Sequence, residues 1–378
     1  MNKDIKTKEI KRDKKGFIKS LPTAVKVFYL CGFVSAFVFV AYTFSEPFSD
    51  FVNRYISSVF RAVLAYLTGW IPFSLAEMVI ILSPLIVVSL IIYAGNRFSS
   101  SWHDVLIFCT SLCSVLALFF SLFTFAFAPG YHGTTLDKKL GIERADVSAE
   151  ELYDTALILA DKVNEVVPEV AFRIKNFSVM PYTYGEMNDK LIDAYDKACQ
   201  EYKFIQKLDS RLKPVMLSEA MSYTHITGVY TFFTGEANIN VAFPDYTVPF
   251  TAAHELAHQR GISRENEASF VAFLVCIASD DSYIRYSGYL NMLEYLLSAL
   301  YGASPELYYE YFEKLPSVAA SDIEASYDVY YKHRDSLLGK INDKLNDAYL
   351  KANGTEGIVS YSYVVRLTVG YYQKDNNR

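Results

Sequence analysis

The residues of this sequence whose types and spacing could do chemistry stand in one short run, His254-Glu255-Leu256-Ala257-His258. Two histidines four positions apart project from one face of an α-helix, because four residues turn through about 400°. Imidazoles placed in this way can bind one tetrahedral Zn²⁺ ion, and Glu255 beside them could act as the general base. The run predicts His254 and His258 as metal ligands and Glu255 as the catalytic residue. Surface histidines beside a salt-bridging glutamate are the competing interpretation.

A catalytic zinc site needs a third protein ligand, and two glutamates after the run are candidates. The longer pattern HExxHxxGxxH is matched at Gly261 but not at its last position, which is Arg264. Glu265 is favoured as the ligand, because Ser269 lies four residues later and could orient a histidine by a hydrogen bond. Glu267 remains the alternate ligand. A site with two histidines and one glutamate leaves the fourth position for water.

Peptide hydrolysis also requires a hydrogen-bond donor for the oxyanion that forms on the carbonyl. Three residues are candidates for this donor: Tyr286, Tyr289 and His225. The strand expected before the catalytic helix could bind an extended peptide along its edge. The residues of this possible substrate strand are Glu236, Ala237, Asn238, Ile239 and Asn240. A structural hairpin that packs on the helix is the alternative interpretation of the same residues.

Local patterns predict the elements that must position these side chains. A first-turn proline and Gly261 bound a short helix over 248–260, and a second helix begins at Glu265 and continues to about Ser279. Residues 228–243 favour a hairpin that turns at Thr234-Gly235. Amphipathic spacing and a capping box at Ser148-Ala149-Glu150-Glu151 predict further helices over 148–167, 188–208 and 320–351. The tail 357–373 has no clear period. The predicted fold is a mainly α (α+β), zincin-like soluble domain over 129–378, with a short β-hairpin before the HExxH helix.

Three apolar runs precede this domain and predict an α-helical membrane anchor of about three spans. The runs are long enough to cross about 30 Å of hydrocarbon, and they cover 27–44, 78–95 and 105–128. The segment before the first run, 1–26, holds nine Lys/Arg against three Asp/Glu, which is typical of a cytoplasmic N-terminus. The membrane domain is therefore predicted over 27–128, with the lipid bilayer as a partner.

The segment 51–73 decides the topology. It is apolar but contains Arg54 and Arg61, and a central arginine costs roughly 2.5 to 3.5 kcal/mol on insertion. An interfacial helix is therefore expected here. Three spans then place 129–378 outside the cytoplasm, whereas a fourth span at 51–73 would place it inside.

Composition excludes several other classes. Residues 129–378 hold 24 Lys/Arg against 35 Asp/Glu, and this acidic balance discourages nucleic-acid binding. No Gly-rich phosphate loop is present, so no nucleotide partner is expected. The five cysteines include no CxxC pair, which argues against a thiolate zinc cluster.

The sequence also resembles a family of uncharacterised bacterial membrane proteins, filed as a domain of unknown function, that have a short multi-span N-terminus and an HExxH domain. The resemblance rests on Ile71-Pro72-Phe73-Ser74, Phe232-Phe233-Thr234-Gly235-Glu236-Ala237-Asn238, the HELAHQRG run His254 to Gly261, Glu265 to Phe270, and Tyr286-Ser287-Gly288-Tyr289. It implies a zinc-peptidase-like fold that is similar to the gluzincin type. The family tends to carry Asn at the position of Ser269.

These observations predict a zinc-dependent metallopeptidase, anchored in a bacterial cell membrane by several passes, with its catalytic domain outside the cytoplasm. Zn²⁺ is the expected cofactor, and a protein or peptide is the expected substrate. The alternative is a catalytically silent, zinc-containing sensor or scaffold that binds a peptide or a cell-wall ligand. The intact general base Glu255 favours the enzyme, because a protein that only binds has no need of it.

Overall fold

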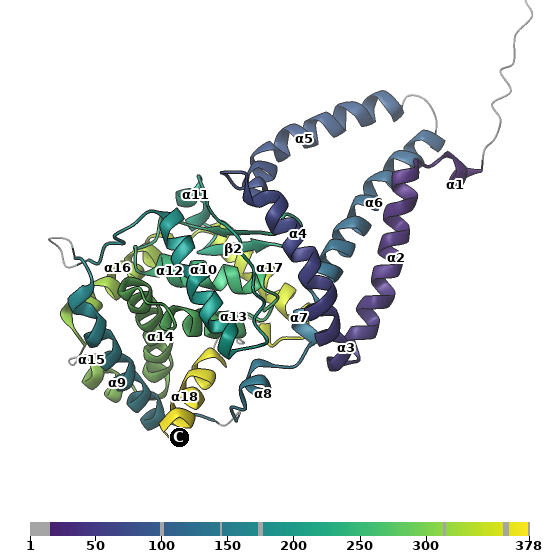
Figure 1. The fold of residues 1–378 in the computed structure, drawn as a ribbon. Helices are drawn as coiled ribbons and strands as arrows, with labels where there is room; N and C mark the ends of the chain where they lie inside the picture. The colour runs from purple at the N-terminus through teal and green to yellow at the C-terminus, as the bar shows by residue number, and fades with distance from the viewer. Residues whose placement is uncertain are drawn as a thin grey trace, which may run out of the picture. The chain divides into compact units, whose positions relative to one another are not determined.

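The computed structural model describes residues 16–98, 102–143, 146–172, 177–312, 315–357 and 363–376, so most of the predicted N-terminal segment 1–26 lies outside the described residues. The fold is mainly helical, as the sequence predicts, and it contains one small three-stranded sheet (Figure 1). Internal contacts divide the chain into two units. The smaller unit comprises Met1–Ala36 and Leu82–Ser121, and the larger unit comprises Phe37–Ile81 and Leu122–Arg378.

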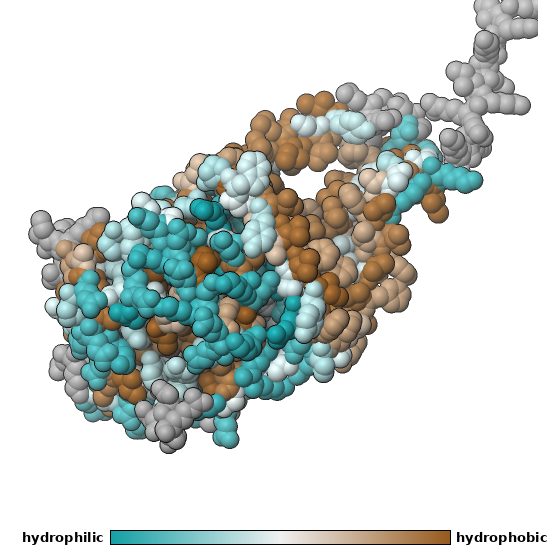
Figure 2. Space-filling view, viewed as in Figure 1, coloured by the Kyte–Doolittle hydropathy of each residue, from teal (hydrophilic) through white to brown (hydrophobic). Residues whose placement is uncertain are grey.

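Three helices in the described part of the chain are long and apolar enough to cross a membrane, and they correspond to the three predicted runs. They are α2 (Thr23–Thr43), α5 (Leu75–Phe98) and α6 (Trp102–Ala126). Each begins three or four residues before the predicted run, because the helix continues through polar residues that interrupt the apolar pattern. In Figure 2, hydrophobic residues cover these helices, whereas hydrophilic residues dominate the visible face over α10 and α13. A surface of this kind suits hydrocarbon rather than water.

The predicted interfacial segment 51–73 is helical as far as Gly69, and the helical run begins before it, at Glu46 in the larger unit. The run has three consecutive pieces. These are α3 (Glu46–Phe51), the π-helix η1 (Val52–Ser57) and α4 (Ser58–Gly69). Arg61, which the sequence presents as an obstacle to insertion, is only 1% exposed. Its guanidinium donates to the side chain and carbonyl of Asn53, to the carbonyl of Ala126 and to the amide oxygen of Gln206. Arg61 therefore joins separate parts of the larger unit.

The sheet consists of β1 (Leu212–Pro214), β2 (Gly228–Thr231) and β3 (Glu236–Ile239), in the order β1-β3-β2. β2 and β3 form the predicted antiparallel hairpin. β1 was not predicted, and it pairs with β3 in parallel. β3 is therefore the central strand, and both of its edges are occupied.

This pairing corrects the prediction that Glu236, Ala237, Asn238, Ile239 and Asn240 bind a substrate by edge pairing. All five are buried, and three of their side chains serve the fold. The Glu236 carboxylate accepts the backbone N–H groups of Leu75 and Ala76 at the start of α5, and the Asn238 and Asn240 amides donate to neighbouring carbonyls. The strand is a structural support for the helix that follows it.

The larger unit surrounds this sheet with helices. α12 (Thr247–Gln259) packs against β3 and against α13 (Glu265–Ile277) and α14 (Ser282–Ala303), and the buried apolar side chains of all three helices belong to one hydrophobic core.

The predicted capping box of Ser148 and Glu151 opens α9. The predicted helix over 320–351 is two helices in the structure, α16 and α17, and the undecided tail contains a helix, α18. The remaining bounds are α1 (Phe17–Ser20), α7 (Pro129–His132), α8 (Leu136–Leu140), α9 (Ala149–Val166), η2 (Val167–Glu169), α10 (Tyr184–Glu201), α11 (Ser218–Ser222), α15 (Pro305–Phe312), α16 (Ser317–His333), α17 (Leu337–Ala352) and α18 (Tyr363–Asn376).

Candidate metal centre

A tight turn between α12 and α13 brings the candidate ligands together. Gly261 ends α12 with a φ of 89°, a left-handed conformation that favours glycine. Its N–H donates to the carbonyl of His258, and the N–H of Ile262 donates to the carbonyl of Ala257, which is the Schellman pattern of a helix C-terminus. The chain then reverses and begins α13 at Glu265, beside the histidines that it has just left.

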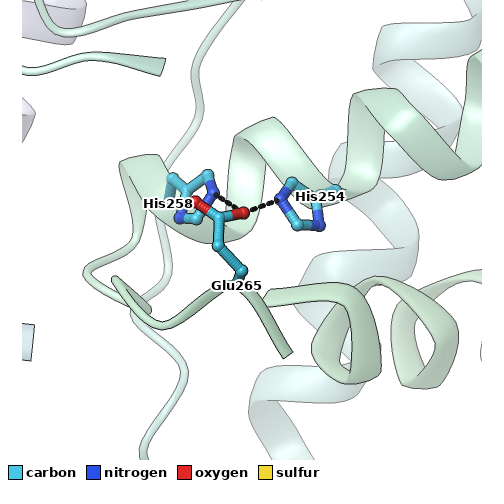
Figure 3. Close-up of side chains that lie close together, drawn as sticks. All are labelled: His254, His258 and Glu265. Atoms are coloured by element: carbon cyan, nitrogen blue, oxygen red, sulfur yellow. Dashed lines mark hydrogen bonds and ion pairs between the residues drawn. The ribbon is translucent and has the colours of Figure 1, made fainter. Parts of the chain in front are cut away.

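His254, His258 and Glu265 form a group whose potential ligand atoms lie within 4.8 Å of one another. Oε2 of Glu265 lies 3.1 Å from Nε2 of His254 and 3.4 Å from Nε2 of His258. Figure 3 shows the carboxylate between the two rings, with both histidines on one face of α12. Two imidazole nitrogens and one carboxylate oxygen therefore converge on a single point, as binding of a metal ion requires.

The second ring nitrogen of each histidine is held by the protein. Nδ1 of His258 lies 2.7 Å from the carbonyl of Ile262, and Nδ1 of His254 lies 3.2 Å from the hydroxyl of Ser269. Ser269 stands one turn after Glu265 on α13, as the sequence argument for Glu265 supposes. Contacts of this kind orient a metal-binding imidazole and keep its Nε2 directed at the ion.

The electrostatics of the group also suit a cation. The Ile262 carbonyl only accepts, so Nδ1 of His258 carries a proton, and Nε2 is the nitrogen that faces Glu265. Burial alone would lower the pKa of His258, but the Glu265 and Glu255 carboxylates raise it to about 9. Burial alone would raise the pKa of Glu265, but both histidines hold it well below its usual range. When no metal is bound, a proton occupies the position that a divalent cation would take.

Glu255 is buried beside this group. Burial raises its pKa to about 8, and its Oε2 has no hydrogen-bond partner among the described residues. The backbone of Gly228 lies against it: a Cβ atom added at Gly228 would stand 2.6 Å from the Glu255 carboxylate. An unpartnered buried carboxylate oxygen next to three convergent ligands is placed to accept a hydrogen bond from water.

These side chains line a cavity of about 920 Å³ that lies entirely within the larger unit. The cavity is formed by α12, by β2 and the residues before it, and by side chains of α14, α16 and α17. His254, Glu255, His258 and Glu265 all contribute to its wall. The candidate metal centre is therefore open to a chamber large enough for part of a peptide.

The alternate ligand Glu267 is directed elsewhere. Its carboxylate accepts the N–H of Leu136 at 2.9 Å and pairs with Arg264 at 3.1 Å. Glu267 is not part of the group formed by His254, His258 and Glu265. The geometry thus selects Glu265.

The three predicted oxyanion donors do not suit that role. Tyr286 is fully buried and its hydroxyl donates to Asp322 at 2.8 Å, while Tyr289 packs on the ring of Phe273; neither lines the cavity. His225 does line it, but both of its ring nitrogens face acceptors, the Asp343 carboxylate at 3.3 Å and the His333 carbonyl at 3.0 Å. No N–H of His225 is left for a substrate.

A better donor, Tyr349 on α17, was not predicted. It lines the cavity, and its hydroxyl accepts a hydrogen bond from Tyr131 at 3.3 Å, which leaves its own proton to donate. Burial raises the pKa of Tyr349 to about 12, the bond from Tyr131 opposes the rise, and the charge of Glu265 adds to it. Tyr349 and the candidate ligand Glu265 line the same cavity. Nothing in the sequence distinguishes Tyr349 from the other 29 tyrosines.

The fold and the site together define a membrane protein whose larger, helical unit carries an HExxH helix and a convergent glutamate. The family described as "Protein of unknown function (DUF3810)" matches residues 48–369. The chain belongs to this family, which confirms the resemblance to a family of unknown function. Searches of curated proteins and of solved structures find no match to the chain.

Proposed function

We propose that this protein is a zinc-dependent metallopeptidase that hydrolyses peptide bonds of protein or peptide substrates at the outer face of a bacterial cell membrane. The observation that carries the proposal is the convergence of Nε2 of His254, Nε2 of His258 and Oε2 of Glu265, each within 4.8 Å of the others. Two histidines and one glutamate are the ligand set of catalytic zinc sites in peptidases, and they leave one position open. The unpartnered Oε2 of Glu255 supports hydrolysis rather than binding alone.

Each residue has a separate task in this mechanism. A zinc ion, when bound, supplies Lewis-acid polarisation of the peptide carbonyl and acidifies water. Glu255 takes a proton from the attacking water and delivers it to the leaving amine. The charge of a bound cation would lower the pKa of Glu255 from about 8 and make it ionised at neutral pH. Tyr349 donates a hydrogen bond to the oxyanion, and it replaces Tyr286, Tyr289 and His225 in this role.

The peptide is expected to pair with β2 rather than with β3. β2 is an edge strand, since β3 is its only partner among the described strands, and Gly228 and Val229 line the cavity. An extended peptide added at this edge would run past Glu255. The free edge and the cavity lie on the same element, which supports this placement.

Zinc analysis of the purified full-length protein tests the proposal. We expect about one zinc per chain in the wild type, loss of zinc in His258→Ala, and retained zinc with hydrolysis reduced by about 10²- to 10⁴-fold in Glu255→Gln. His103→Ala, which removes an exposed histidine of α6, is the matched control and should retain zinc. Substrates can be sought by comparing the proteomes of wild-type and Glu255→Gln cells.

Two results would overturn the proposal. A wild-type protein without stoichiometric zinc would remove the metal centre. Stoichiometric zinc with equal peptide cleavage by wild type and Glu255→Gln would remove the enzymatic role of the site and leave the silent sensor or scaffold.

A further inference from the structure

The wall of the cavity is rich in carboxylates. The described residues that line it include four carboxylates and no lysine or arginine. Glu255 and Glu265 belong to the candidate metal centre, and Asp343 lies 3.3 Å from His225. The fourth, Glu294 on α14, is not accounted for by the proposed mechanism.

One hydrogen bond fixes Glu294. The hydroxyl of Tyr246, a fully buried residue before α12, donates to its Oε1 at 2.6 Å. Ser326 lines the cavity together with Glu294. In the described part of the chain Glu294 has no ion pair and no other hydrogen bond, so its second oxygen is left to the cavity.

No lysine or arginine among the described residues forms an ion pair with this carboxylate. Burial raises the pKa of Glu294 to about 7, the bond from Tyr246 opposes the rise, and the charge of Asp322 adds to it. Glu294 is partly buried, a carboxylate held away from water without a cation is costly, and groups with perturbed pKa values of this kind cluster at functional sites. The matching ligand carries a positive charge.

The residues around Glu294 indicate which kind of cationic ligand fits there. Tyr295 and Tyr327 also line the cavity, and the charge of Glu294 adds to the rise that burial causes in the pKa of both. Aromatic faces bind the aliphatic stem of lysine or arginine and attract its charged end. A long side chain with an apolar stem and a cationic end fits better than a small cation does.

The position of Glu294 relative to the metal ligands sets the reach required. Tyr246 precedes α12 directly, and Thr247 and His254 on that helix both line the cavity. Seven residues of α-helix span about 10 Å. One extended residue of about 3.3 Å followed by a four-carbon lysine stem covers a similar length. Glu294 and the candidate metal ligands line one cavity, and a lysine stem of this length is what a residue next to the cleaved bond would use to reach Glu294.

We propose that Glu294 makes the cavity selective for peptides that carry a lysine or arginine side chain next to the cleaved bond. This inference rests on the proposed zinc peptidase function, because the metal centre fixes where the peptide lies. Glu294 acts as a residue that determines specificity and takes no part in the proton transfers.

A binding measurement tests Glu294 without relying on catalysis. The probes are two short peptide hydroxamates, which chelate zinc, with either lysine or its uncharged analogue norleucine next to the hydroxamate. On the zinc-loaded full-length protein, we expect the lysine probe to bind about 10- to 100-fold more tightly. Glu294→Gln, which keeps the shape of the side chain, should reduce this ratio to about one. Isothermal titration calorimetry gives both dissociation constants.

Asp343→Asn is the matched control, because it removes another carboxylate from the same wall. It should retain the lysine preference, because that preference depends on the contact of lysine with Glu294 and not on the total charge of the cavity. Equal binding of the two probes to the wild type would overturn the role of Glu294 and leave the zinc site intact. Binding of neither probe would overturn the metal centre, and the inference with it. A lysine preference retained in Glu294→Gln would also contradict the inference.

Discussion

Ser269 is the residue that orients His254, and its hydroxyl lies 3.2 Å from Nδ1 of that ring. Ser269→Ala should weaken zinc binding by about tenfold or more, because contacts of this kind contribute 10- to 100-fold to metal affinity. Ser269→Asn should retain most of the affinity, because its amide can also hydrogen-bond the ring. Competition with a zinc-chelating dye measures both variants. Unchanged affinity in Ser269→Ala would show that Ser269 does not support the ligand.

Tyr349 is expected to act on the transition state alone. Tyr349→Phe should lower kcat by about 10²- to 10³-fold, the usual effect of removing one oxyanion donor, with little change in KM or zinc content. Steady-state kinetics on a cleaved peptide, together with metal analysis, separates these effects. Tyr309→Phe, at an exposed tyrosine of α15, is the control and should leave kcat unchanged. A rise in KM alone would instead place Tyr349 in substrate binding.

Glu294 should make stability depend on pH. Its folded pKa is raised from 4.5 to about 7 by burial, so the stability that it contributes is fully present below about pH 4.5 and is lost as pH rises through 7. Glu294→Gln cannot ionise. Its free energy of unfolding, relative to that of the wild type, should therefore rise by at most about 3 kcal/mol between pH 5 and pH 8. Asp322 interacts with Glu294, so the difference also includes the change in Asp322 ionisation that follows the loss of the Glu294 charge. Thermal unfolding at the two pH values measures it, and a difference that does not vary with pH would contradict the prediction.

At the scale of elements, α4 and η1 support the turn that ends α12. Arg61 on α4 donates to Asn53 on η1, and the Asn53 amide donates at 2.9 Å to the carbonyl of Gly261. Arg61 also lies against Gly261, where a Cβ atom would meet its guanidinium at 2.5 Å. Asn53 and Arg61 therefore stabilise the turn at Gly261. The carbonyl of the next residue, Ile262, orients His258.

Arg61→Ala should lower the free energy of unfolding by about 3 kcal/mol or more, because it leaves several buried acceptors without a donor. It should also weaken zinc binding, since the turn at Gly261 loses its support. Arg54→Ala is the matched control: this arginine is exposed on η1, and its removal should change stability by about 0.5 kcal/mol or less. Thermal unfolding and zinc titration of the detergent-purified variants measure the two effects. Equal stability of the two variants would refute the role given to Arg61.

At the scale of the whole molecule, three spans and a cytoplasmic N-terminus predict that the larger unit ends outside the cytoplasm. A reporter that is active only outside, such as alkaline phosphatase, should therefore be active when fused after Arg378 and inactive when fused after Phe98 in α5. The charges support this orientation, because basic segments favour the cytoplasmic side. The opposite pattern of activity would mean that Glu46–Gly69 or another segment crosses the membrane as a fourth span.

The sequence by itself determined the elements whose signals are local. His254 and His258 share a face because their spacing follows the helix period, and Gly261 ends α12 because the turn needs a positive φ. The capping box at Ser148, the hairpin of β2 and β3 and the three apolar helices were predicted for the same reason. Each of these depends on residues that are close together in the chain.

Only the tertiary structure decided the features that depend on distant contacts. β1 pairs with β3 across more than twenty residues, and this pairing turned a predicted substrate strand into a central one. Glu267 contacts Leu136 and Arg264 instead of the histidines. Tyr349 and Glu294 line the cavity, and they lie on helices that follow the HExxH helix. A short strand or a single tyrosine carries no local signal of its partner, since packing of the whole unit selects that partner. The metal-binding pattern could thus be predicted from the sequence, and the walls of its cavity could not.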